Sequence, residues 1–137
     1  MAHKRFSQAE KEAIVAEDFI ITDWINLPAP TPVQKEFLAS VSIAGLPHTH
    51  FFAFYSAIVD RLVALECARF TGEYRLESLA DKREARHKRL AACNELEGRI
   101  AEYKIAIKKE SQFNRQVELN TNVKQLKSQL AELTGSL

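Results

Sequence analysis

The chain has 137 residues, of which 46% are hydrophobic and 27% charged, and its formal net charge is +1. This length fits one domain, or a small domain with a helical extension. The near-neutral charge argues against wholesale binding to nucleic acid and leaves only a local basic patch open.

The first elements predicted along the chain are two short strands. The segment 2–6 (AHKRF) can form one, and 13–27 is rich in Ile, Val, Phe, Thr and Trp, which favours a second over about 18–25. Two strands do not make a stable sheet by themselves. They would need helices packed on them, or strands from another chain or a missing region.

Three prolines, Pro28, Pro30 and Pro32, indicate a linker over 27–31. Thr31 and Gln34 then resemble a capping box, which predicts a short helix over 32–41. An extended, serine-rich connection is the alternative for the same stretch.

A central helix is predicted from about residue 50, with Thr49 as its N-cap and Gly72 as its stop. Large apolar side chains recur there at spacings of three and four from Phe51 to Leu65. The helix is apolar over most of its girth, which is typical of a buried element. We therefore expect it to be the core of a small α+β region over residues 1–72.

Residues 73–137 contain no proline and predict a C-terminal amphipathic helical segment. One apolar stripe runs from Leu90 to Ile107, and a second, from Leu119 to Leu133, is rotated from it by about 110° at 100° per residue. Either one long helix meets different partners, as in a coiled coil, or the helix reverses near 110–122 as a helical hairpin. The reversal is favoured because it buries the stripes against each other. The predicted fold class is therefore mainly α with a small β element.

Candidate contact residues lie on the last part of this segment. The stretch 108–120, KKESQFNRQVELN, surrounds two apolar residues with amides, and it predicts either docking on a partner or a polar bend. The leucine seam that follows needs another helix to cover it. The predicted partner or helix–helix contacts are Phe113, Asn114, Val117, Leu119, Val123, Leu126, Leu130 and Leu133.

Four basic residues carry the alternative hypothesis of phosphate contact. At helical spacing they fall on one stripe that could grip a nucleic-acid backbone, although no aromatic residues interleave with them for base stacking. The alternative is a solvated helix face whose charges pair with nearby acids. These residues are Arg75, Lys82, Arg86 and Arg89.

No motif of catalysis is present: there is no phosphate loop, nucleophile elbow or zinc spacing. His48 and His50 form an HxH pair, for which helix capping or surface exposure is the simpler explanation. We therefore expect no enzyme activity, cofactor or metal. Cys67 and Cys93 are expected to be reduced and buried in a cytoplasmic protein without a signal peptide or membrane span.

Four segments, at 2–10, 18–24, 54–62 and most specifically 108–120, resemble the C-terminal part of a bacterial domain-of-unknown-function family, number four-three-nine-one. The resemblance implies a further N-terminal α/β region in other members, and the two strands would fit a sheet that has been cut. It also implies an accessory role near DNA, because members are often encoded beside helicases and methyltransferases of restriction-like defence systems. It supplies no catalytic residues.

These observations predict a non-enzymatic protein-interaction or oligomerisation module acting through its C-terminal helices, with itself or another protein as partner. An accessory protein that binds nucleic acid through the stripe around 75–89 is the alternative.

Overall fold

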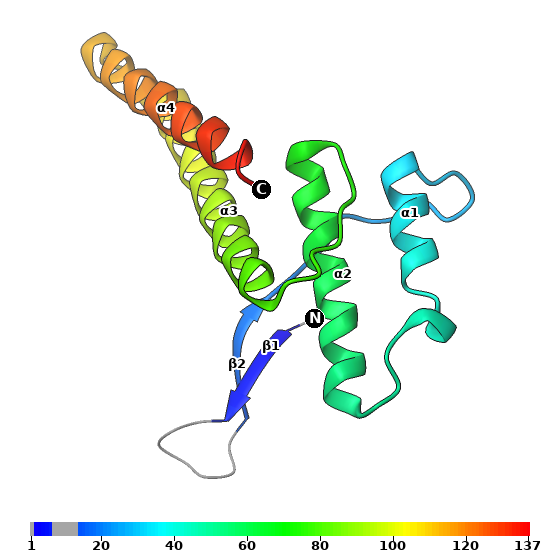
Figure 1. The fold of residues 1–137 in the computed structure, drawn as a ribbon. Helices are drawn as coiled ribbons and strands as arrows, with labels where there is room; N and C mark the ends of the chain where they lie inside the picture. Colours follow the sequence, from blue (N-terminus) through cyan, green and yellow to red (C-terminus); the bar gives the residue numbers. More distant parts are fainter. Residues whose placement is uncertain (1, 7–13) are drawn as a thin grey trace. The chain divides into compact units, whose positions relative to one another are not determined.

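The computed structural model describes residues 2–6 and 14–137, with side chains from Phe19 onward. It consists of two compact units, Met1–Ser78 and Leu79–Leu137, which are described separately below. Four α-helices account for most of the described residues (Figure 1).

The first unit begins with β1 (Ala2–Phe6) and β2 (Ile14–Phe19), an antiparallel pair with a register shift between His3 and Lys4. The strand predicted over 18–25 is wrong, because the backbone from Ile20 to Ile25 has no regular secondary structure. The β-rich composition of this stretch is a weak signal, since strand propensity depends on pairing and on burial.

Helix α1 (Pro32–Ser40) begins at the predicted capping box. The Thr31 Oγ1 accepts a hydrogen bond from the Gln34 amide at 3.3 Å, and the Gln34 Oε1 accepts one from the Thr31 amide at 3.0 Å. Pro32 at the first helical position loses nothing, because its missing N–H would have no intrahelical partner. The helical alternative for this stretch is therefore confirmed, and a 3-10 turn, η1 (Ile43–Gly45), follows it.

Helix α2 (Phe51–Thr71) ends at Gly72, whose φ of 79° is the left-handed conformation expected of a glycine C-cap. Its N-cap is His50, not Thr49: the imidazole Nδ1 accepts a hydrogen bond from the Ala53 amide at 3.1 Å. Every residue from Val63 to Ala68 is buried, whereas Phe51 and Phe52 in the first turn are exposed. The prediction of a helix buried along its length therefore holds only for its C-terminal half.

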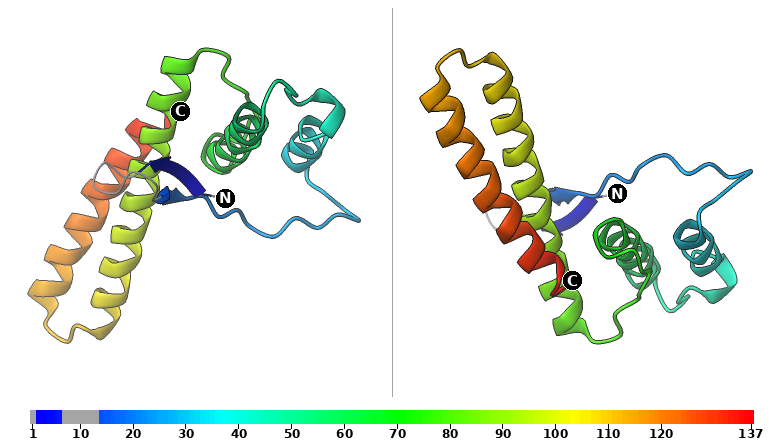
Figure 2. Two further views of the ribbon diagram at one scale, coloured as in Figure 1. Left: turned by 90° about the horizontal axis from the view of Figure 1, so that it is seen from below. Right: turned by 90° about the horizontal axis from the view of Figure 1, so that it is seen from above.

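Helices α1 and α2 lie side by side (Figure 2), and polar side chains join them. The Arg61 guanidinium on α2 donates to the Ser40 carbonyl at the end of α1, at 2.7 Å, and to the Ala57 carbonyl in its own helix. The Tyr74 and Ser40 hydroxyls are 2.7 Å apart, and the Tyr74 ring packs edge-on against Phe37. These contacts hold the last turn of α1 in place and leave its first turn beside the irregular segment after β2.

The second unit is a helical hairpin of α3 (Ala80–Lys109) and α4 (Phe113–Thr134), as both figures show. The predicted reversal is confirmed and occurs over residues 110–112. The helix begins at Ala80 instead of Glu73, because residues 73–79 are irregular. Asp81 near the start of α3 and Lys108 and Lys109 near its end carry the charges that suit the helix dipole.

The predicted fold class therefore needs correction. From Ile20 onward the described chain contains helices and connections but no strand, and the β1–β2 pair bonds only to itself. The architecture from Ile20 onward is helical, and the small β element is limited to the β1–β2 pair at the start of the chain. None of the described helices is both long and apolar enough to span a membrane.

Candidate functional site

The leucine seam of α4 is covered by α3 of the same chain. Val123 and Leu126 are buried and form a core with Ile100. Leu96, Tyr103, Ile107 and Leu130 pack against this core and are partly buried. Of the other predicted seam residues, Leu119 and Leu133 are partly buried. The helix that shields these leucines is therefore part of the hairpin.

The turn between the two helices is organised by Glu110. Its Oε1 accepts hydrogen bonds from the backbone amides of Ser111 and Gln112, both at 2.9 Å. Its carbonyl accepts a hydrogen bond from the Gln116 side chain at 2.6 Å. The amides and acid of the 108–120 motif thus build the bend, which was one of the two alternatives for this motif.

Phe113, Asn114 and Val117 point away from the hairpin core. All three are exposed, and Phe113 is 75% exposed. At about 100° per residue, Asn114 and Val117 lie about 150° from the centre of the Val123–Leu126 face and Phe113 about 110° from it, so none of them lies on that face. The predicted set of contact residues is therefore divided between an inner face and an outer face of α4.

The predicted basic stripe is not assembled as one helical face. Arg75 lies in the irregular connection before α3, where its Nε is 3.5 Å from the Glu73 carboxylate. Lys82 is exposed on α3, Arg86 is buried and Arg89 is partly buried. The four residues therefore do not share one exposed helix face.

Both histidines of the HxH pair make contacts at the start of α2. His50 caps α2, and the His48 ring lies 6.2 Å from that of Phe54. Within the described residues, no group of three or more His, Cys, Asp or Glu is placed to hold a metal ion. Cys67 and Cys93 are both buried, and neither forms a disulfide in the described structure.

The two most exposed large apolar side chains of the described residues lie in a short segment of the first unit, which we call the exposed apolar segment (Phe19–Leu27). It begins at the last residue of β2 and is otherwise irregular. Trp24 is 99% exposed and Ile21 is 82% exposed, while Phe19 and Leu27 exceed two-thirds. Only Ile20 in this segment is buried, and it anchors the backbone. A group of large apolar residues so exposed is typical of an interaction site.

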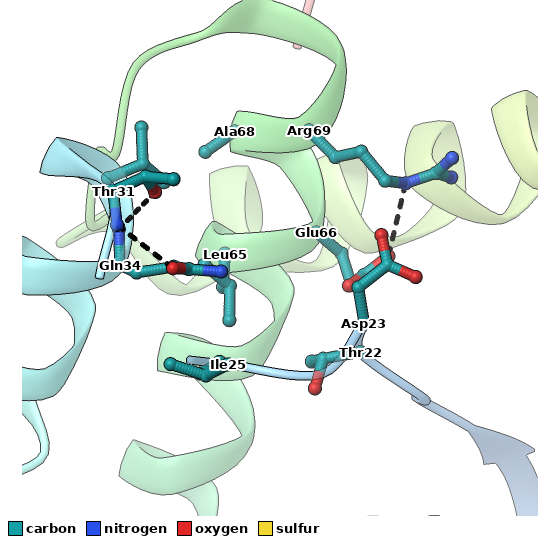
Figure 3. Close-up of a pocket in the computed structure, with 10 residues that line it drawn as sticks. Thr22, Asp23, Ile25, Thr31, Gln34, Leu65, Glu66, Ala68 and Arg69 are labelled. Atoms are coloured by element: carbon teal, nitrogen blue, oxygen red, sulfur yellow. Dashed lines mark hydrogen bonds and ion pairs between the residues drawn. The ribbon is translucent and has the colours of Figure 1, made fainter. Parts of the chain in front are cut away.

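A pocket of about 250 Å³ opens beside the same segment (Figure 3). Thr22, Asp23 and Ile25 line it from the exposed apolar segment. The start of α1 contributes a second wall through Thr31 and its capping box, with Val33 and Gln34.

The third wall of the pocket comes from the buried end of α2. Leu65 and Ala68 supply apolar surface, and Glu66 supplies a carboxylate that is 8% exposed. The Arg69 Nε lies 3.4 Å from the Glu66 Oε2, and its guanidinium stacks 4.3 Å over the Phe70 ring. The Arg69 guanidinium therefore makes both an ion pair with Glu66 and a cation–π contact with Phe70.

Sequence reasoning missed both Glu110 and the pocket. A negative charge close to a helix N-terminus is favourable, so the role of Glu110 could have been predicted from its place just before α4. The pocket depends on three segments that meet only in the fold, and no spacing in the sequence indicates it.

No curated protein and no solved structure matches this chain. The model of one family, the domain of unknown function DUF4391, matches residues 1–130, which is nearly the whole chain. This match confirms the resemblance drawn from the four sequence segments. The chain therefore belongs to the DUF4391 family.

Proposed function

We propose that this protein is an oligomerisation module in which two copies join through the exposed apolar segment. The observation that carries the proposal is the near-complete exposure of Trp24 among three other large apolar side chains. The sequence predicts the same class of function. The proposal assigns the contact between copies to the exposed apolar segment instead of the C-terminal leucine seam.

The size of the surface supports a contact between chains. Two aromatic side chains such as Phe19 and Trp24 bury about 300–500 Å² together. Ile21 and Leu27 add to this area. The sum is a large share of the roughly 800 Å² that each partner buries in a stable complex.

The charge of the chain supports a second copy as the partner. A twofold contact places the same surface patch of each copy against the other. Such a contact needs no complementary charge, and a net charge of +1 gives little repulsion between copies. We also propose that the module acts in the cytoplasm, which two buried cysteines without a disulfide support.

No observation favours nucleic-acid binding as a second candidate, since Arg75 lies off the helix and Arg86 is buried. The accessory role in a bacterial restriction or defence locus remains an implication of the family resemblance. This role is compatible with an oligomerisation module, and it identifies no further contact residues.

Light scattering at several protein concentrations tests the proposal. The wild type should approach twice the 15.5 kDa mass of one chain, and the double variant Ile21→Ser/Trp24→Ser should stay at that mass. Trp24 is the single tryptophan, so its emission should shift to the blue as wild-type copies associate.

The matched control is Phe113→Ser/Val117→Ser, which removes the apolar residues on the outer face of α4. It should associate like the wild type. A wild type that remains at 15.5 kDa at every concentration would refute the proposal. Loss of association in the control alone would instead place the interface on the C-terminal helices.

A further inference from the structure

The pocket beside the exposed apolar segment has walls of two kinds. Leu65, Ala68 and Ile25 form an apolar surface, and Asp23 and Glu66 bring carboxylates to one side of it (Figure 3). An apolar wall with a few convergent polar groups is the usual character of a binding pocket.

The size of the pocket limits its occupant. At about 250 Å³ it is smaller than the roughly 300–1,000 Å³ of sites for cofactors and drug-sized ligands. A nucleotide or a flavin would not fit, whereas one long side chain would.

The charges of the lining residues favour a cation. Two carboxylates face one guanidinium, and that guanidinium, Arg69, already lies against Glu66 and over the Phe70 ring. Asp23 makes no ion pair or hydrogen bond with any described residue. A cation entering the pocket would therefore meet an available carboxylate.

The adjacent helix start does not offer an anion site. At the N-terminus of α1, the Gln34 amide is bonded to Thr31, and Pro32 has no N–H. Among the described bonds this leaves the Val33 amide as the one N–H of the first turn without an acceptor, so the helix start is a weak site for a negative group. The described residues also hold no set of three ligands for a metal ion.

We propose that this pocket binds an arginine side chain of a partner protein, with Asp23 pairing with its guanidinium. The alkyl stem would lie on Leu65 and Ala68, as long basic side chains commonly lie on apolar surface. The planar guanidinium suits a carboxylate better than an ammonium does, because it can donate two parallel hydrogen bonds. This inference does not rest on self-association.

A pair of blocked tripeptides tests it, Gly-Arg-Gly and its citrulline counterpart, in which a neutral urea replaces the guanidinium. Each is titrated into ¹⁵N-labelled full-length protein and followed by NMR. The arginine peptide should saturate with a Kd on the order of 1 mM, as expected for one anchored side chain. The citrulline peptide should bind at least about tenfold weaker, which corresponds to one lost charged hydrogen bond.

Variants locate the interaction. Asp23→Asn should abolish the preference for arginine over citrulline, while Glu36→Gln, an exposed acid on α1 outside the pocket, should keep it. The shifted amides should include those of 22–25 and 65–69. Raising the salt concentration should weaken the arginine peptide more than the citrulline peptide.

Three results would overturn the proposal. The first is equal affinity for the two peptides in the wild type. The second is a preference for arginine that survives Asp23→Asn. The third is no saturable binding of either peptide, or shifts confined to residues outside the pocket.

Discussion

The two candidate contact surfaces, the hairpin seam and the exposed apolar segment, differ in how far their apolar side chains are buried. In the hairpin of α3 and α4, the seam residues Val123 and Leu126 are buried against Ile100. In the first unit, Trp24 and Phe51 are 99% and 80% exposed. A helical hairpin can complete its own core, whereas the first unit presents apolar surface that another molecule can cover. This contrast is the reason for proposing that copies join through the exposed apolar segment and not through the hairpin seam.

The largest expected effect on stability comes from truncating a buried leucine in the hairpin seam. Leu126→Ala should lower the free energy of unfolding by about 2–3 kcal/mol, toward the lower end for buried leucines because the core around it is small. Urea denaturation followed by far-ultraviolet circular dichroism measures this loss. Lys127→Ala, at an exposed neighbour, should change stability by less than about 0.5 kcal/mol.

The same variant also tests the comparison itself. Because the seam is closed within one chain, Leu126→Ala should leave the mass in solution equal to that of the wild type. A variant that keeps its stability but loses association would show that the seam joins chains, and the contrast between the units would fail.

Two glycines give the next largest effects, with opposite signs. Gly72→Ala should destabilise by about 1–2 kcal/mol, because its φ of 79° is unfavourable for a residue with a Cβ atom. Gly98→Ala should stabilise by about 0.5–1 kcal/mol, because this glycine lies inside α3.

In both cases an added Cβ meets nothing within 4 Å, so steric clashes do not obscure the result. The thermal midpoints of the two variants should therefore move in opposite directions from that of the wild type. A shift of the same sign for both would contradict the assignment of Gly72 as a left-handed cap.

The turn of the hairpin provides a smaller effect. Glu110→Ala removes the acceptor of two backbone amides at the start of α4 and should cost about 1 kcal/mol. Glu110→Gln keeps an acceptor oxygen and should cost less. Glu118→Ala, at an exposed site on α4, is the matched control for thermal unfolding. Equal midpoints for Glu110→Ala and the control would show that Glu110 does not hold the turn.

Local signals predicted much of the helical structure. The capping box at Thr31, the stop at Gly72 and the reversal after Lys109 each depend on residues close in sequence. The strand over 18–25 was wrong because a strand needs a partner, which its own composition does not reveal. The start of α3 was placed too early because residues 73–79 contain neither proline nor a strong helix stop.

The candidate site was harder to predict than the fold. Sequence spacing correctly grouped Val123 and Leu126, since both depend on one helical period. Spacing does not reveal whether an apolar residue outside a helix is covered, so the exposure of Trp24 could not be foreseen. The pocket joins Asp23 to α1 and α2, and its lining depends on packing between segments more than 40 residues apart.

The smallest expected effect on stability comes from the solvent-exposed face of α3. Glu84 and Lys88, four residues apart on this face, are in contact at 2.7 Å, while Glu95 and Arg99, at the same spacing, form no ion pair in the described structure. The hydrogen bond from Lys88, and then its positive charge, lower the pKa of Glu84 below its ordinary value of 4.5. A carboxyl whose pKa is lower in the folded state stabilises that state above the unfolded pKa. This stabilisation is lost as the pH falls through the folded pKa.

Because the Glu84–Lys88 pair is solvated, its contribution should be small and sensitive to salt. Glu84→Gln should lower the thermal midpoint slightly at pH 7, and the difference from the wild type should vanish in acid well below pH 4.5. Glu95→Gln, which removes an unpaired acid at the equivalent position, should show no such dependence on pH. If both variants behave alike at every pH, the contact with Lys88 contributes nothing to stability, and the solvated face of the hairpin serves only to keep the seam side inward.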